Sequence, residues 1–236
     1  MAGMVFDASA LPDVSALTVG IIGGTGDQGR GLAYRLARAG QPVLIGSRTA
    51  PRAAQAAAEL VELLGAAAGG TPPAWGGNAE VAQRSDVVIV AVPWAGHAET
   101  VAALRAPLAG KVVVDCVNPL GFDPQGPYAL RVPEGSAAQQ AAGLLPDSRV
   151  CAAFHHVSAP LLADPTVERI DLDVLVCADD RAAAATVQAL ACRIPGMRGV
   201  YAGRLRNAGQ VEALTANLIA INRRYKAHAG VRVTDL

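Results

Sequence analysis

The 236-residue sequence is poor in charge, in aromatic side chains and in long apolar runs. Charged residues make up 17% of the chain and aromatic residues 4%, and the formal net charge is +0. A nucleic-acid-binding protein needs a basic surplus to meet phosphates, so we expect no nucleic-acid partner. Glycines and charged residues interrupt every apolar run before the roughly 18 residues that span a bilayer. We therefore expect no membrane partner either.

The cysteines and the first residues also exclude classes of protein. The four cysteines show no Cys-x-x-Cys spacing and stand in apolar stretches. Such cysteines are typical of small buried side chains in a reducing compartment, and we see no metal-ligand spacing elsewhere. Residues 1–16 lack the basic start and long apolar core of a secretory signal. We expect them to be an N-terminal extension and the protein to be cytoplasmic.

Short apolar, β-branched runs alternate with helical patterns along the chain. The predicted strands cover residues 17–22, 42–45, 86–92, 111–117, 149–154 and 173–177, and the predicted helices cover residues 28–39, 53–64, 96–108, 181–193 and 207–225. This alternation indicates an α/β fold, a Rossmann-type doubly wound parallel sheet with a small C-terminal α/β lobe. We place the Rossmann domain at 17–163 and the lobe at 164–236. The Pro- and Gly-rich segment 121–135 is predicted to be a loop.

A glycine motif follows the first predicted strand and opens the first predicted helix. Gly24, Gly26 and Gly29 form the pattern G-x-G-x-x-G. The first glycine permits a tight turn, the second lets the backbone approach a pyrophosphate, and the third lets the helix pack closely on the strand. The free N–H groups at the helix start favour an anion there. The motif in this context predicts a dinucleotide-binding site.

The end of the second predicted strand indicates which dinucleotide is bound. An NAD-binding protein usually has a carboxylate there that grips the ribose 2′-hydroxyl. This chain has Ser47 and Arg48 instead, with Arg52 one turn along. A hydroxyl and two guanidinium groups suit a 2′-phosphate, so the pattern predicts NADP(H). The alternative is that both arginines only solvate a surface loop.

Several motifs in a fixed order resemble one known family. They are Gly23-Gly24-Thr25-Gly26, Gly31-Leu32-Ala33, Gly46-Ser47-Arg48, Val92-Pro93-Trp94, Ala153-Phe154-His155 through Ser158-Ala159, Val176-Cys177-Ala178-Asp179-Asp180, Val211-Glu212-Ala213-Leu214-Thr215 and Lys226-Ala227-His228-Ala229-Gly230. Together they resemble the NADPH-dependent reductases of coenzyme F420, over nearly the whole chain from about residue 17. The NADP-binding domains of membrane metalloreductases share the fold and part of the pattern.

The resemblance implies reversible hydride transfer between NADPH and the deazaflavin of coenzyme F420, in a homodimer. It places Thr25, Gly26, Asp27 and Gln28 on the pyrophosphate, Ser47, Arg48 and Arg52 on the 2′-phosphate, Pro93, Trp94, Asn118 and Ala159 along the nicotinamide half, and His155, Val157, Ser158, Gly230 and Val231 at the F420 site. The C-terminal lobe would then carry the acceptor site and the dimer contacts. Asp27 departs from expectation, because a carboxylate in a phosphate loop must point to solvent, cap the helix or weaken binding.

His155 is the candidate catalytic residue. A deazaflavin that accepts hydride gains negative charge, which a nearby hydrogen-bond donor or proton source stabilises. A histidine can titrate near neutral pH and so fill this role. The alternative is that His155 or His156 only caps backbone groups in a turn.

Two other functions remain open from the sequence. One is an NADPH-dependent reductase of another small acceptor, such as a flavin, an imine or a ferric chelate. The other is a non-catalytic NADPH-sensing module, which would bind NADPH without turnover. The chain has no Tyr-x-x-x-Lys pair, which disfavours a short-chain carbonyl reductase.

Overall fold

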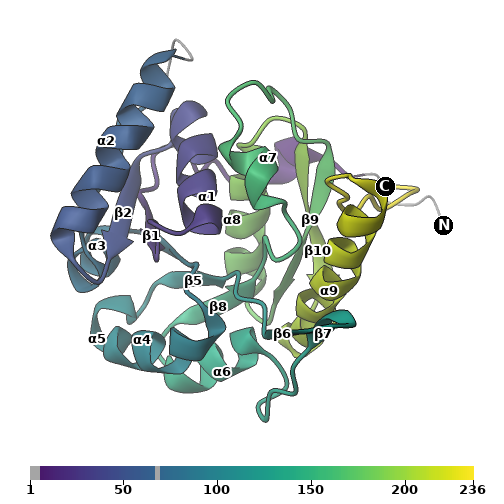
Figure 1. Cartoon of the computed structure of the whole chain (residues 1–236). Helices are drawn as coiled ribbons and strands as arrows, with labels where there is room; N and C mark the ends of the chain where they lie inside the picture. Colours follow the sequence, from purple (N-terminus) through teal and green to yellow (C-terminus); the bar gives the residue numbers. More distant parts are fainter. Residues whose placement is uncertain (1–5, 67–69) are drawn as a thin grey trace.

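The computed structural model describes residues 6–66 and 70–236, which form an α/β structure around one eight-stranded sheet (Figure 1). The strands stand in the order β10-β9-β8-β5-β4-β1-β2-β3, and all neighbours are parallel except β8 and β9. Their bounds are β1 Val19–Ile22, β2 Val43–Ser47, β3 Ala74–Gly77, β4 Val87–Val90, β5 Val112–Asp115, β8 Arg149–Ala152, β9 Leu172–Ala178 and β10 Met197–Gly203. The predicted doubly wound α/β fold is confirmed.

Helices cover both faces of this sheet. Their bounds are α1 Asp27–Arg38, α2 Ala50–Ala66, α3 Asn78–Arg84, α4 His97–Ala103, α5 Arg105–Leu108, α6 Ala137–Leu144, α7 Ala159–Ala163, α8 Arg181–Cys192 and α9 Ala208–Tyr225. In Figure 1, α1 and α2 lie on one side of the sheet and α4, α5 and α6 on the other. Strand β1 is buried along its whole length, as a parallel strand covered on both faces must be.

Two hydrophobic clusters make up the core, one on each face of the sheet. Ile21 of β1 packs in the cluster beneath α1, α2 and α8, whereas its neighbour Ile22 packs in the cluster beneath α3 to α6. This division follows from the alternation of side chains along a strand. Both clusters include residues beyond 164, among them Val174 and Val211. Residues 164–236 therefore share the sheet and the core with residues 17–163.

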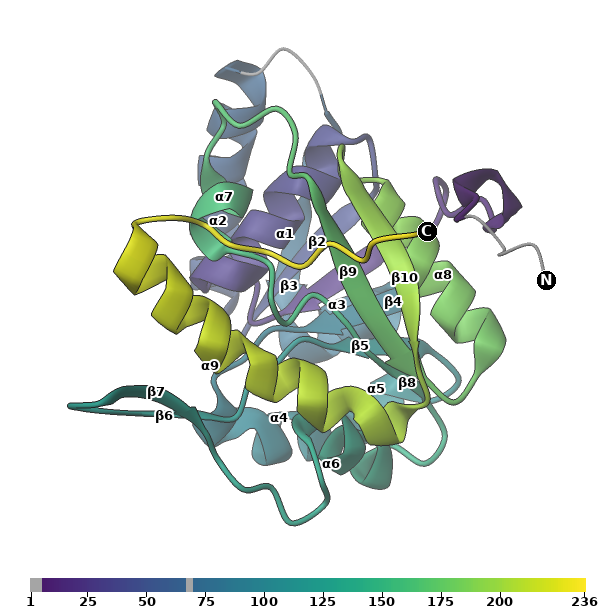
Figure 2. The same cartoon turned by 90° about the vertical axis from the view of Figure 1, so that its right-hand side faces the viewer.

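The segment predicted to be a loop at 121–135 contains a β-hairpin. Strands β6 (Leu120–Asp123) and β7 (Gly126–Ala129) pair antiparallel and project from the body of the molecule (Figure 2). The Asp123 carboxylate accepts the N–H groups of Gln125 and Gly126, at 2.8 and 3.1 Å, and Gly126 has a φ of 125°. This turn chemistry closes the hairpin, although Gly and Pro hide the strand pattern in the sequence.

Other elements also differ from the sequence-based expectation. Strands β3 and β10 and helices α3, α6 and α7 were not predicted. Strand β3 is a Gly-rich edge strand, β10 begins after Gly196 and ends at Gly203, and the three helices have at most eight residues. The predicted helix at 96–108 is divided into a 3₁₀ turn at Trp94–Gly96 followed by α4 and α5. None of the helices in the described ranges is long and apolar enough to cross a membrane.

The N-terminal extension is tied to the core where the structure describes it. Val14 is 3% exposed, and its carbonyl accepts a hydrogen bond of 2.7 Å from the buried Gln41 side chain. The expected extension at 1–16 also includes residues 1–5, which lie outside the described residues.

Candidate active site

Three adjoining cavities follow the carboxyl edge of the parallel strands. The loop cavity, about 350 Å³, lies beside the glycine motif and Arg48; the central cavity, about 310 Å³, lies between Trp94 and Asn118; and the α9 cavity, about 480 Å³, lies along the last helix. The loop and central cavities share residues 91–93, and the central and α9 cavities share Gln28 and Asn118. They thus form one extended groove at the edge where doubly wound folds bind ligands.

The glycine motif leaves space only at its middle position. A methyl group on Gly29 would lie 2.7 Å from the Gly23 carbonyl oxygen, and one on Gly24 would lie 2.9 Å from the Ile21 carbonyl oxygen. At Gly26 the nearest atom would be 3.5 Å away. The outer glycines are therefore required by the packing of the turn and helix α1, whereas Gly26 leaves the backbone open to a ligand.

Asp27 does not cap helix α1. Gly26 is the N-cap residue and Asp27 is the first helical residue, exposed and on the wall of the central cavity. Its carboxylate meets the positive end of the helix dipole, which favours a negative charge there. Gln28 next to it lies in both the central and the α9 cavity and donates a hydrogen bond of 3.1 Å to the Phe154 carbonyl.

Ser47, Arg48 and Arg52 all line the loop cavity, as the sequence suggested. Ser47 is 5% exposed at the end of β2, whereas both arginines are exposed. No carboxylate in the described ranges forms an ion pair with either arginine. The sequence did not reveal Asn78, which lines this cavity and whose buried Oδ1 has no hydrogen-bond partner in the described structure. No local motif marks it, because it begins the unpredicted helix α3.

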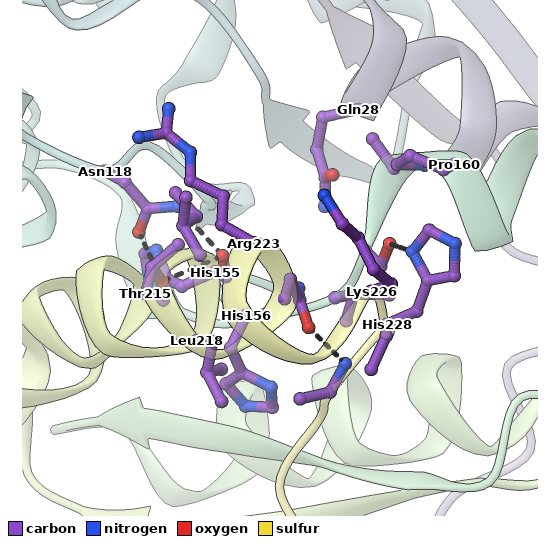
Figure 3. A pocket seen from close by; sticks show the side chains of 17 residues that line it. Gln28, Asn118, His155, His156, Pro160, Thr215, Leu218, Arg223, Lys226 and His228 are labelled. Atoms are coloured by element: carbon purple, nitrogen blue, oxygen red, sulfur yellow. Dashed lines mark hydrogen bonds between the residues drawn. The ribbon is translucent and has the colours of Figure 1, made fainter. Parts of the chain in front are cut away.

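Figure 3 shows the α9 cavity, where residues of the 155–160 loop face the C-terminal half of α9. Phe154, directly before this loop, has a φ of 64°, an unusual conformation for a residue with a bulky side chain. The His155 carbonyl accepts hydrogen bonds from Asn118 Nδ2 at 2.8 Å and Thr215 Oγ1 at 3.1 Å. These contacts hold the His155 backbone against Asn118 and against helix α9.

His155 is 3% exposed and lines the α9 cavity, and neither of its buried ring nitrogens has a hydrogen-bond partner in the described structure. Burial lowers the pKa of His155 to about 4, although the Asp115 charge opposes the shift. The expectation that His155 titrates near neutral pH is therefore wrong. Its ring is neutral at pH 7 and carries one N–H donor. Burial likewise lowers the pKa of His156 to about 4.

The mouth of the α9 cavity is cationic. Arg223 and Lys226 line it, and no Asp or Glu does. His228 Nδ1 lies 3.1 Å from Ser158 Oγ, which joins the C-terminal segment to the 155–160 loop (Figure 3). From the sequence alone, these cations fit either an approach for an anionic ligand or a solvated basic helix end.

Comparison with known proteins places this chain in a family. Residues 18–119 match the family model described as NADP oxidoreductase coenzyme F420-dependent. The F420-dependent NADP reductase of Methanothermobacter thermautotrophicus is 38% identical, with 94% of this chain and 97% of that protein covered. The chain belongs to the F420-dependent NADP reductase family. A second member, from Methanocaldococcus jannaschii, is 35% identical over 93% of this chain and 99% of its own length.

Solved structures agree with this membership. A putative F420-dependent NADP-reductase from Arthrobacter sp. FB24 superposes with a TM-score of 0.74, is 26% identical and covers 93% of this chain and 100% of its own. A pyrroline carboxylate reductase from Plasmodium falciparum, solved with NADP bound, reaches a TM-score of 0.59 at 10% identity, which shows likeness of fold alone.

Most of the remaining site residues expected from the reductase family line one of the three cavities, but two do not. Thr25, Pro93, Trp94 and Asn118 line the loop or central cavity, and Val157, Ser158 and Ala159 line the α9 cavity. Gly230 and Val231 line none of the three cavities. The Val231 carbonyl instead accepts the Asp173 N–H at 2.8 Å, so this part of the tail is held against β9. The adjoining Ala229 lies in the α9 cavity in their place.

Proposed function

We propose that the protein transfers hydride reversibly between NADPH and coenzyme F420. The observation that carries this proposal is the single groove, which passes from the arginines at the end of β2, across the glycine motif, to the cavity under α9. A groove of this kind fits two ligands that meet end to end over the central cavity.

The residues in the loop and central cavities fit NADPH. The open space at Gly26 suits a pyrophosphate, while Ser47, Arg48 and Arg52 suit the 2′-phosphate. The unpartnered Asn78 Oδ1 suits a ribose hydroxyl or adenine amino group. Trp94 and Asn118 border the central cavity, where they would orient the nicotinamide.

The residues in the α9 cavity fit the acceptor. F420, when bound, supplies a deazaflavin carbon that takes up or returns hydride. His155 would donate an N–H hydrogen bond to the ring side where negative charge develops, which requires no change in its own protonation. Arg223 and Lys226 would meet the anionic phosphate and glutamate tail at the cavity mouth. Buried Val157 and Leu218 would keep water from the reacting rings.

A spectroscopic assay with purified protein tests the function directly. We expect NADPH to bleach the deazaflavin absorbance of F420, and NADH, or FMN in place of F420, to do so far less. Measurable NADPH binding without bleaching would reject F420 as acceptor. It would favour another small acceptor or the NADPH-sensing module.

A charge inversion tests the NADP preference within this assay. Arg48→Glu places a carboxylate beside the proposed 2′-phosphate site, so we expect the NADPH Kd to rise at least tenfold and the NADH Kd to change little. Arg105→Glu, on exposed α5 and away from the groove, is the matched control. An unchanged NADPH Kd for Arg48→Glu would contradict the assignment.

We further propose a cytoplasmic homodimer, with residues 164–236 carrying the dimer contacts together with the hairpin at 120–129, and the acceptor site together with the 155–160 loop. Phe122 and Tyr128 on the hairpin and Ile221 and Tyr225 on α9 are exposed large hydrophobic side chains, and α9 contacts β7. Such a patch on one face is typical of a subunit interface. Light scattering should report a dimer that Tyr225→Glu dissociates and Val61→Lys, an exposed site on α2, does not. A monomeric wild type would refute the dimer.

A further inference from the structure

A buried chain of polar side chains lies beneath the central cavity. His97 Nε2 is 2.6 Å from Asp115 Oδ2, and both side chains are fully buried. His97 Nδ1 is 2.9 Å from Gln140 Oε1. Glu212 of α9, 2% exposed, is a further carboxylate near this group and raises the pKa of His97. Neither Asp115 nor His97 lines any of the three cavities, so this chain is separate from the ligand-facing surface.

The hydrogen bonds to the two ring nitrogens of His97 favour a positively charged ring. The Gln140 side-chain nitrogen donates to Glu134 at 3.2 Å, which turns its oxygen toward the His97 ring. His97 therefore faces an acceptor at each ring nitrogen, an arrangement that favours the doubly protonated ring. Burial lowers the pKa of His97, but the hydrogen bond and charge of Asp115 outweigh burial and the net shift is upward. Asp115 and His97 thus form a buried hydrogen-bonded pair in which Asp115 favours the protonated ring.

Asp115 is connected through its hydrogen bonds to two residues that line the central cavity, Asn118 and Trp94. Its Oδ1 accepts the Val117 N–H at 3.0 Å, which fixes the turn that presents Asn118. Asn118 in turn donates to the His155 carbonyl at 2.8 Å. Through His97 the same carboxylate supports Trp94, whose ring centroid is 5.5 Å from that of His97.

We propose that Asp115 is a positioning residue that sets the distance between the Trp94 and Asn118 walls, where the two reacting rings meet. The inference rests on the proposed hydride transfer. Its physical basis is that a misplacement of about 1 Å between donor and acceptor costs on the order of a hundredfold in rate. A buried hydrogen-bonded pair that is connected to both walls holds the distance between them more rigidly than apolar packing beneath the cavity would.

Asp115→Asn tests the proposal, because the amide keeps an oxygen for Val117 but loses the charge that holds His97. We expect kcat with F420 to fall about tenfold and the NADPH Kd to change less than about threefold, since the nucleotide is held mainly in the loop cavity. The matched control is Asp180→Asn, which removes the charge of another aspartate that accepts a backbone N–H, that of Ala183 at 2.8 Å, and lines none of the three cavities. This control should lower stability without lowering kcat of the folded protein.

A second readout needs no ligand. In a Trp75→Phe background Trp94 is the remaining tryptophan, and an adjacent imidazolium quenches its emission. Asp115→Asn should therefore brighten Trp94 at pH 7, because His97 loses its proton. His97→Gln, which keeps a donor for Asp115 but removes the ring, should brighten Trp94 and lower kcat about threefold to tenfold. It serves as the test if Asp115→Asn does not fold.

The two proposals fail in different ways. If the wild type does not turn over F420, the proposed function fails, and the positioning role is then judged by Trp94 emission alone. Unchanged emission in the folded Asp115→Asn protein overturns the inference whatever the acceptor. An unchanged kcat in that variant, with an active wild type, overturns it as well.

Discussion

Replacing Glu212 by glutamine should change how the stability of the fold depends on pH. Glu212 of α9 is 2% exposed and accepts the N–H groups of Ala137 and Ala138, at 2.9 and 3.2 Å, at the start of α6. Burial raises the pKa of Glu212 to about 7, and the Asp115 charge adds to this, while the two N–H groups and His97 oppose it. The carboxylate thus caps a helix at the cost of losing its hydration.

The expected magnitude follows from the two protonation equilibria. The folded-state pKa of about 7 exceeds the ordinary 4.5, so the folded protein binds this proton more tightly than the unfolded chain. The resulting stabilisation is complete below pH 4.5 and is lost as the pH rises through 7. Linkage gives a loss of about 2.5 kcal/mol in the free energy of unfolding between about pH 5 and about pH 8. Glutamine cannot ionise, so Glu212→Gln should not show this component.

Urea unfolding of wild type and Glu212→Gln at both pH values measures the effect. The difference between the two proteins should move in favour of the variant by about 2.5 kcal/mol from pH 5 to pH 8. The lowered pKa values of His155 and His156 act in both proteins and cancel in the difference. Glu99→Gln, at an exposed position on α4, is the control. A difference that is the same at both pH values, within about 0.5 kcal/mol, would refute the reasoning.

Three further predictions concern the phosphate loop. Gly29→Ala should lower the free energy of unfolding by about 1–3 kcal/mol, because its methyl group would lie 2.7 Å from the Gly23 carbonyl oxygen; an unchanged urea midpoint would contradict this. Gly26→Ala, whose nearest atom would be 3.5 Å away, should keep stability within about 0.5 kcal/mol but weaken NADPH binding at least tenfold by calorimetry; wild-type affinity would argue against a phosphate at this position. Asp27→Asn should tighten NADPH about threefold, since an exposed carboxylate about 6 Å from a phosphate costs about 0.7 kcal/mol in water; weaker binding would show that the carboxylate helps instead.

The sequence was sufficient to predict the features that depend on neighbouring residues. Apolar β-branched runs and helical periods lie within single elements, so they indicated the doubly wound sheet. Gly24, Gly26 and Gly29 act within one turn, and Ser47-Arg48 stands at the end of a strand, so the sequence could also predict a dinucleotide site. The hairpin at 120–129 was missed because glycines and a proline interrupt its strand pattern, and the Gly-rich strand β3 was missed because its pairing with β2 stabilises it.

Only the tertiary structure decided the electrostatics of the site. Whether His155 ionises near pH 7 depends on how completely other segments bury it, and the fold lowers its pKa to about 4. The Asp115–His97 pair joins residues from different elements, and Arg223 reaches the cavity mouth because α9 packs across the carboxyl edge of the sheet. Local sequence therefore determined which residues could bind a dinucleotide. Long-range packing determined their charge, their distance from one another and the cavity for the second ligand, because desolvation and contact depend on segments far apart in the chain.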